Sequence, residues 1–233
     1  MPDALVERDG STLIVTMNRP HRKNAQSGAM LCRMLDAWEE ASRNDDIRCI
    51  ILTGAEGNFS SGADLRAMAG DSGPHADTEI DVAARMKDEP RLMHKAYLKE
   101  YRPTKPIIAA VEGVAIAGGT EILLGTDIRV AAEILLTGKH ITAQEAYKWG
   151  LVGSVVPDGQ ALKAAKEIAG VICDNGPLSV EAILRTLHET DGMEEAVALK
   201  YEEPYGTAVF ATEDAKEGPK AFSEKRKPNF QRK

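Results

Sequence analysis

The sequence predicts an α/β domain followed by a helical C-terminal region. Apolar, β-branched runs alternate with segments of helical periodicity up to about residue 157. Some of these runs are apolar on both faces, as strands are when helices cover each side of a sheet. Beyond that point almost only helical patterns follow. We therefore divide the chain into a core of residues 1–157 and a helical region of residues 158–233.

Three elements open the core. Residues 12–17 (TLIVTM) are apolar and β-branched and end at an Asn-Arg-Pro turn, which predicts a strand. From Gly28 onward apolar residues recur at helical spacing, with charged residues mostly on the opposite face, which predicts an amphipathic helix. Residues 49–53 (CIILT) predict a second strand, buried on both faces.

The middle of the chain is less regular. Residues 54–62 (GAEGNFSSG) form a small-residue loop, and Ala63-Asp64-Leu65 marks a helix start. Residues 71–77 (DSGPHAD) predict a mobile segment. Residues 80–101 predict a helical region that Pro90 kinks or divides.

The remaining elements follow the same rules. Residues 106–111 (PIIAAV) and 127–131 (DIRVA) predict two further strands, separated by the glycine loop 117–119 and a helical turn over 120–125. A capping box at 142–145 predicts a helix that Gly150 closes. The last predicted elements are a short strand at 151–156 and helices at 161–172, 178–187 and 219–227.

Composition and charge exclude several classes of protein. The 29 Lys and Arg against 36 Asp and Glu give a net charge of −7, which argues against a nucleic-acid or membrane-surface partner. No window approaches the roughly 18 continuous apolar residues of a membrane helix, and the start has no export signal. Cys32, Cys49 and Cys173 lie far apart among apolar neighbours, as buried free thiols of a cytoplasmic protein do. The histidines show no metal-binding spacing, so we expect no metal site.

Two glycine loops carry the clearest chemical signal. FSSGADL (59–65) and AIAGGTE (115–121) each place small residues between a buried strand and a helix start, where free backbone N–H groups favour negative charge. Two such donors that converge on one oxygen form an oxyanion hole, and removing one costs about 3 kcal/mol of barrier. A single loop of this kind is more often only a tight turn between a strand and a helix. Because two such loops occur in this sequence, we interpret them as a functional site.

Five motifs together resemble the crotonase family, the enoyl-CoA hydratase/isomerase superfamily. They are MNRPHRKNA, GNFSSGADL, KPIIAAVEGVAIAGGTEILLGTDIRVAAE, LLTGKHITAQEAYKWGLVGSVVP and EGPKAFSEKRKPNF, in the family's order from about Leu13 to Phe230. The resemblance implies a crotonase-like spiral of ββα units with a helical C-terminal trimerisation region, assembled as a homotrimer or homohexamer. It also implies an acyl-CoA thioester substrate, with coenzyme A as part of that substrate and no separate cofactor.

By the same resemblance, the backbone N–H groups of Ala63 and Gly118 hold the thioester oxygen and stabilise an enolate. Glu121 matches one of the two glutamates that position and activate water in the hydratases. Hydration needs one group to take a proton from water and another to deliver one to the α carbon. Without the family, Glu121 would be a surface acid that complements a helix dipole.

The resemblance also assigns contacts with coenzyme A. Part of the first loop lies beside the ligand, mainly through its backbone, and cations near residue 22 suit the CoA phosphates. The tail segment reaches CoA, often on a neighbouring subunit. For Arg22, Lys23 and Lys225 the alternative to a CoA contact is a solvated surface charge. For Phe222 it is an aromatic ring packed in the protein. The candidate residues are Arg22, Lys23, Ala25, Ser61, Asp64, Leu65, Phe222 and Lys225.

The sequence departs from the family at one junction. Glu133 is followed directly by Ile134, where the family has a strand, turn and helix of about 30 residues that carry the second glutamate. Either the numbering passes over a segment that the protein contains, or the chain has an internal deletion that strongly reduces hydratase activity. We prefer the first explanation. The loss of a packed unit should cost more free energy than the roughly 5–15 kcal/mol of stability that a typical domain has.

These observations predict an enoyl-CoA hydratase, a lyase of fatty-acid or related lipid breakdown. Double-bond isomerisation is the alternative within the family, since it needs only one acid/base group. A non-catalytic acyl-CoA-binding or assembly subunit is the alternative from another class. The motifs of other enzyme classes, GxSxG, GxxxxGK[ST] and GxGxxG, do not occur.

Overall fold

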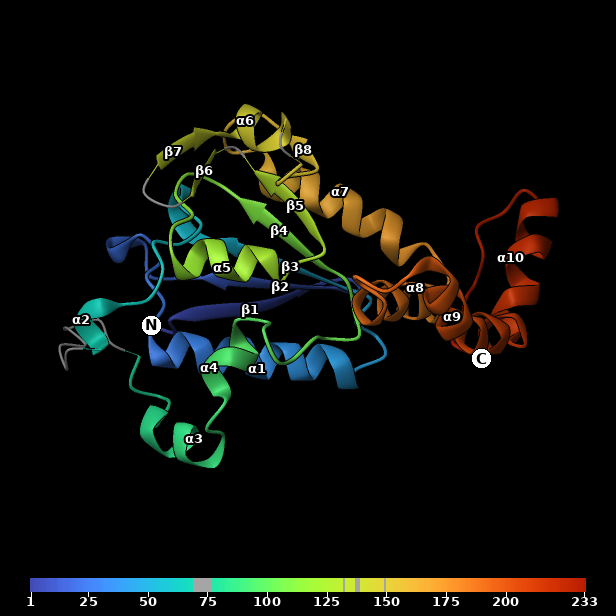
Figure 1. Cartoon of the computed structure of the whole chain (residues 1–233), viewed down its shortest axis with the longest axis horizontal. Coiled ribbons are helices and arrows are strands. Elements are labelled where there is room, and N and C mark those ends of the chain that lie inside the picture. The colour runs from blue at the N-terminus through green and yellow to red at the C-terminus, as the bar shows by residue number, and fades with distance from the viewer. Residues whose placement is uncertain (69–76, 132, 137–138, 149) are drawn as a thin grey trace.

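A computed structural model describes residues 1–68, 77–131, 133–136, 139–148 and 150–233. Six strands form one mixed sheet in the order β1-β2-β3-β4-β5-β8 (Figure 1). Strands β1 and β2 pair antiparallel, and every later pair in this sheet is parallel. The strands are β1 (Ala4–Asp9), β2 (Thr12–Met17), β3 (Cys49–Gly54), β4 (Ile107–Val111), β5 (Ile128–Ala131) and β8 (Ser154–Val155).

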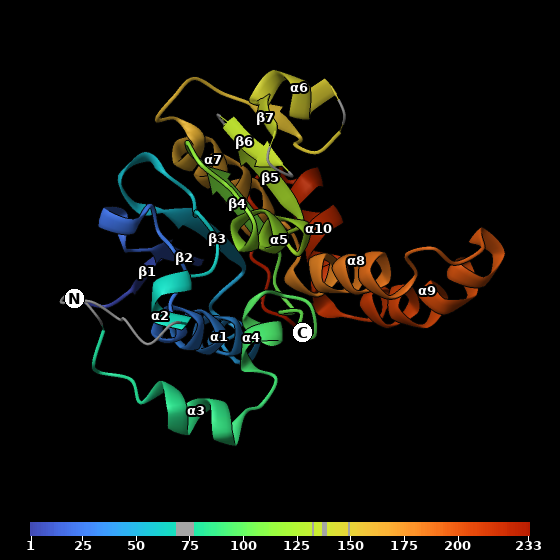
Figure 2. The same ribbon diagram turned by 60° about the vertical axis from the view of Figure 1, so that its left-hand side comes forward.

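Helices cover both faces of this sheet. Helix α1 lies on one face with α4, and α7 packs on β3, β4 and β5 from the other (Figure 1). Helices α8 and α9 lie side by side and project away from the sheet (Figures 1 and 2). The helices are α1 (Gly28–Arg43), α2 (Leu65–Met68), α3 (Val82–Asp88), α4 (Leu92–Ala96), α5 (Gly118–Leu124), α6 (Ala143–Lys148), α7 (Ala161–Cys173), α8 (Pro177–Glu189), α9 (Glu195–Phe210) and α10 (Glu213–Ser223).

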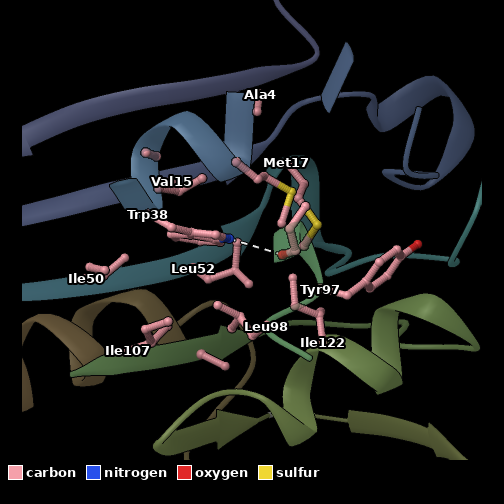
Figure 3. Close-up of a cluster of buried hydrophobic side chains, with 14 of the residues drawn as sticks. Ala4, Val15, Met17, Trp38, Ile50, Leu52, Tyr97, Leu98, Ile107 and Ile122 are labelled. Atoms are coloured by element: carbon pink, nitrogen blue, oxygen red, sulfur yellow. Dashed lines mark hydrogen bonds between the residues drawn. The ribbon is translucent and has the colours of Figure 1, made fainter. Parts of the chain in front are cut away.

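The central strands are buried on both faces, as predicted. In β3, Ile50 and Leu52 point to the α1 side of the sheet, whereas Cys49 and Ile51 point to the α7 side. On the α1 side Trp38 is fully buried and its indole Nε1 donates to the carbonyl of Ala96, 3.0 Å away (Figure 3). This hydrogen bond satisfies the one polar atom of a large core side chain and fixes α4 against α1.

Most predicted elements are confirmed, including the strands at 12–17 and 49–53 and the helix that begins at Gly28. The helical region at 80–101 is divided into α3 and α4, with Pro90 between them. The mobile segment predicted over 71–77 lies, up to residue 76, outside the described residues. The mixed sheet with C-terminal helices agrees with the predicted α/β class.

Several features differ from the prediction. Strand β1 was not expected, because most of its residues are not buried and it lacks an apolar run. Helix α9 was missed because its apolar residues follow no single stripe and Pro204 lies inside it. Helix α10 begins at Glu213, six residues before the predicted start, because Thr212 provides its N-cap by accepting from the backbone N–H of Ala215.

The junction at residue 133 is continuous. Strands β6 (Glu133–Leu136) and β7 (Lys139–Thr142) form a separate antiparallel pair, in which Glu133 faces Thr142 and Ile134 faces Ile141. Glu133 and Ile134 are thus consecutive residues of one strand.

The short α6 that follows has the predicted capping box. The Thr142 hydroxyl accepts from the Glu145 N–H at 3.2 Å, and the Glu145 carboxylate accepts from the Thr142 N–H at 2.8 Å. All three cysteines are free, although Cys173 is only partly buried. No helix in the described ranges is long and apolar enough to cross a membrane.

Candidate active site

The segment before α1 holds the first glycine loop in place. The backbone N–H of Gln26 donates to the Gly62 carbonyl at 2.8 Å, and the Gln26 carbonyl accepts from the Asp64 N–H at 3.0 Å. The Ser61 N–H likewise donates to the Lys23 carbonyl at 2.9 Å. Gln26 thus forms a parallel β-bridge with Ala63 through the Gly62 carbonyl and the Asp64 N–H. The N–H of Ala63 itself has no hydrogen-bond partner among the described residues.

The second glycine loop leads into α5. Ala117 precedes this helix with φ 47° and ψ −120°, a conformation that a residue with a side chain seldom adopts. Such strained backbone persists where the surrounding structure holds it and is concentrated at functional sites. As the first residue of α5, Gly118 has an N–H without a partner in the helix, and no other described group accepts from it.

The two loops lie in direct contact. Gly62 has φ +91°, and a Cβ placed on it would lie 2.9 Å from the Ile116 carbonyl oxygen and 3.0 Å from the Gly118 nitrogen. Only glycine fits this close approach. Both unpaired donors therefore lie on the wall of one pocket of about 370 Å³. The pocket is lined by Ser61, Ala63, Leu65, Met93, His94, Tyr97, Lys99, Ala117, Gly118 and Glu121.

Glu121 lies one turn into α5, on the wall of the same pocket. Its Oε2 is 2.7 Å from the Nζ of Lys99, and about half of each side chain is exposed to solvent. Among the described residues that line this pocket, Glu121 is the only one with a carboxylate. The pocket thus brings together two unpaired backbone N–H groups and one carboxylate, and five predicted residues meet here: Ser61, Ala63, Leu65, Gly118 and Glu121.

Sequence reasoning missed three polar residues that line this pocket, His94, Tyr97 and Lys99. The Tyr97 hydroxyl donates to Oε1 of Gln26 at 2.5 Å, and both side chains are buried. Burial, with the nearby negative charge of Glu121, raises the pKa of Tyr97 to about 12, so its hydroxyl stays protonated at neutral pH. Tyr97 and Gln26 are 71 positions apart, and no local pattern links them.

Asp64 is held by two arginines rather than presented to the pocket. Its carboxylate is 2.7 Å from Nη1 of Arg19 and 2.8 Å from Nη1 of Arg22, and only 4% of its side chain is exposed. It also accepts from the backbone N–H groups of Arg66 and Ala67 at the start of α2. Asp64 thus holds one nitrogen of the Arg22 guanidinium, Nη1, and joins both arginines to the start of α2.

The charge on Asp64 predicts a pH dependence of stability. Burial raises its pKa, but hydrogen bonds from Arg19, the Ala67 N–H and Arg22 outweigh burial and leave the pKa below the ordinary 3.8. A depressed carboxyl pKa stabilises the fold above the unfolded value, and this stabilisation is lost as the pH falls below about 4. Asp64→Asn, which retains an acceptor for the α2 cap, should therefore lower the free energy of unfolding at pH 7 more than at pH 3. Urea unfolding of both proteins between pH 3 and pH 7 checks this prediction. A difference in unfolding free energy between the two proteins that does not change with pH would contradict it.

The other predicted contacts lie in two places. Lys23 is exposed beside Ser61, and Ala25 is buried in the same segment. Phe222 is 87% exposed on α10, and Lys225 is an exposed residue just beyond that helix. Helix α10 lies at the opposite end of the molecule from α2 and the first loop (Figure 1). A single copy of the chain therefore does not bring Phe222 and Lys225 to the pocket.

No cluster of three or more His, Cys, Asp or Glu side chains in the described part of the chain could hold a metal ion.

Comparison with known proteins gives consistent matches. A family model described as enoyl-CoA hydratase/isomerase matches residues 7–133 and 129–233. Enoyl-CoA hydratase EchA19 of Mycobacterium tuberculosis is 49% identical over 271 residues, covering 99% of this chain and 97% of the relative. The 2,3-dehydroadipyl-CoA hydratase of Escherichia coli is 31% identical and covers 99% of both chains. The crystal structure of an enoyl-CoA hydratase from Mycobacterium tuberculosis superposes with a TM-score of 0.86 at 32% identity, covering 100% of both chains.

The same comparisons locate the shortened part of the chain. The alignment with EchA19 spans 271 residues, 38 more than the 233 of this chain, so at least that many aligned positions have no counterpart here. The two matches to the family model meet at residues 129–133. The family's sequence is therefore interrupted at the junction where the sequence itself indicated a missing unit.

Proposed function

Because this chain belongs to the enoyl-CoA hydratase/isomerase family, the crotonase family, we propose that it is an enoyl-CoA hydratase, a lyase that adds water across the 2,3 double bond of an acyl-CoA thioester. One observation supports this most directly. No described group accepts from the N–H groups of Ala63 and Gly118, both residues line one pocket, and Glu121 lines the same pocket. Donors and base are thus arranged for enolate chemistry next to a thioester.

In this mechanism the thioester oxygen accepts from both N–H groups. Negative charge develops on that oxygen as water attacks C3, and the two donors together with the N-terminus of α5 stabilise it. Glu121 accepts the proton that water releases. The Lys99 ammonium, 2.7 Å from Glu121, orients the carboxylate at the pocket mouth.

The missing unit limits this activity. Hydration also requires that a proton is delivered to C2. The family resemblance implies that the second glutamate of the two-carboxylate hydratases delivers this proton. With Glu121 as the one carboxylate among the described pocket residues, we expect hydration to be much slower than in such enzymes. This observation supports double-bond isomerisation as a second candidate, because a single group that removes a proton at one carbon and returns it at another is sufficient.

The remaining parts of the proposal concern assembly and context. We propose a homotrimer or homohexamer in which Phe222 and Lys225 reach the ligand of a neighbouring copy, while Ser61, Leu65 and the segment at residues 22–25 contact coenzyme A within one copy. Large apolar side chains exposed on α8 and α9 support an association through the C-terminal helices. They include Ile183, Leu187, Leu199 and Phe210. The proposed setting is fatty-acid or related lipid breakdown in the cytoplasm.

A panel of acyl-CoA thioesters tests the proposed activity. A hydratase removes the absorbance of the conjugated thioester in crotonyl-CoA, whereas an isomerase raises this absorbance from a 3-enoyl-CoA. A binding subunit does neither but still binds the thioester in a calorimetric titration. Loss of crotonyl-CoA absorbance supports hydration, and turnover of the 3-enoyl substrate alone favours isomerisation. Sedimentation of the same samples measures the assembly.

A further inference from the structure

The Tyr97–Gln26 hydrogen bond lies between the two oxyanion loops. Gln26 carries the first loop, because its backbone N–H and carbonyl bond the residues on either side of Ala63. Its side-chain Oε1 accepts from the Tyr97 hydroxyl at 2.5 Å. One residue therefore connects a donor of the oxyanion hole to the segment that follows α4.

The same hydrogen bond contacts the second loop. A Cβ placed on Gly118 would lie 2.7 Å from Oε1 of Gln26 and 2.7 Å from the hydroxyl oxygen of Tyr97. The hydrogen-bonded pair thus packs directly against the α-carbon of the second donor residue. Figure 3 shows the Tyr97 ring at the edge of the core cluster, with its hydroxyl pointing away from Trp38.

The position of this pair is well fixed. Only 3% of Gln26 and 6% of Tyr97 is exposed, and the Tyr97 ring is part of the core on the α1 side of the sheet. The other end of the Gln26 amide contacts Sδ of Met17, 3.9 Å away and fully buried. The hydroxyl has a fixed acceptor, and the bond is shielded from water.

We propose that the Tyr97–Gln26 hydrogen bond sets the spacing between the Ala63 and Gly118 N–H groups, so that both reach the same thioester oxygen. Tyr97 and Gln26 are positioning residues in this inference, which rests on the proposed acyl-CoA chemistry of the site. An oxyanion hole requires both donors within about 2.7–3.1 Å of one oxygen, so a small shift between the loops weakens transition-state binding. Displacements of about 1 Å reduce rates by as much as a hundredfold.

Tyr97→Phe removes the hydroxyl and leaves the ring in place. We expect about a tenfold lower kcat with nearly unchanged KM, because CoA contacts elsewhere in the site remain. The direct readout is the infrared carbonyl stretch of bound butyryl-CoA labelled with carbon-13 at the thioester carbon. The unchanged protein should lower this frequency by polarising the carbonyl, and the variant should lose part of that shift.

Tyr101→Phe is the matched control. Its hydroxyl donates to Oγ of Ser42 at 2.9 Å, it is partly buried on the same connecting segment, and it does not line the pocket. This variant should retain both kcat and the carbonyl shift. Gln26→Met removes the acceptor instead, and the double variant with Tyr97→Phe should lose no more kcat than the larger single loss, because both changes break one bond.

The results for these variants decide whether the Tyr97–Gln26 bond sets the spacing of the two N–H groups. Equal kcat and equal carbonyl frequency in Tyr97→Phe and the unchanged protein would overturn the inference, as would an equal loss in Tyr101→Phe. If Tyr97→Phe does not fold, Gln26→Met applies the same test to the other partner. If the unchanged protein itself neither binds butyryl-CoA nor shifts its carbonyl frequency, the proposed function fails, and the inference fails with it.

Discussion

Replacing Glu121 by glutamine should reduce turnover of the preferred enoyl-CoA substrate by about 10²- to 10⁴-fold, the usual contribution of a positioned acid/base group. Glutamine has nearly the same shape as glutamate but does not accept a proton from water. Because half of the Glu121 side chain is exposed, the free energy of unfolding should change by about 0.5 kcal/mol or less. Initial rates at saturating substrate, with urea unfolding of the same samples, measure both quantities.

Glu89→Gln is the matched control for this experiment. Glu89 also pairs with a lysine, since its Oε2 lies 2.6 Å from Nζ of Lys95, but it does not line the pocket. The loss of this solvent-exposed ion pair should leave the rate unchanged. An undiminished rate in Glu121→Gln would refute the role proposed for that residue, whichever reaction the enzyme catalyses.

Gly62→Ala should have the second-largest effect, on both rate and stability. The φ of +91° at this position strains any residue with a side chain, at a cost of about 1–3 kcal/mol. The added methyl group would lie 2.9 Å from the Ile116 carbonyl oxygen and 3.0 Å from the Gly118 nitrogen, so the loops must move apart. Since one oxyanion donor is worth about 10²- to 10³-fold in rate, we expect kcat to fall by about a hundredfold.

Gly57→Ala separates backbone strain from loop displacement. Gly57 has φ +74°, but a Cβ placed there meets no atom within 4 Å. This control should lose similar stability and keep its kcat. The prediction for Gly62 is contradicted if both variants lose stability and both keep the rate of the unchanged protein, because the separation of the loops would then have no catalytic consequence.

Local patterns were sufficient for much of the fold. The β-branched run at residues 12–17 and the doubly apolar run at 49–53 became β2 and β3, because burial on both faces leaves no other arrangement for such segments. The helical spacing after Gly28 predicted α1 for the same physical reason. Strand β1 carries little apolar signal, because it pairs with only one neighbour and most of its residues are not buried.

The candidate site also has features that the sequence predicted and features that it did not. The two glycine loops were singled out because a small-residue loop before a helix leaves unpaired N–H groups, a property of the local backbone, and the family resemblance then selected Ala63, Gly118 and Glu121. The family resemblance supplied their roles. The Tyr97–Gln26 bond and the Lys99–Glu121 ion pair could not be predicted, because each joins residues from distant segments that meet only when the sheet and its helices pack.

The sequence by itself determined the α/β class, the family and the point after Glu133 where its motifs depart from the family's order, because each is encoded in neighbouring residues or in their order. Only the tertiary structure decided that Arg22 binds Asp64. It also decided that α10, the helix that carries Phe222, lies at the opposite end of the molecule from α2 (Figure 1). The physical reason is that side-chain partners depend on how segments far apart in sequence approach one another, and no local pattern records that approach.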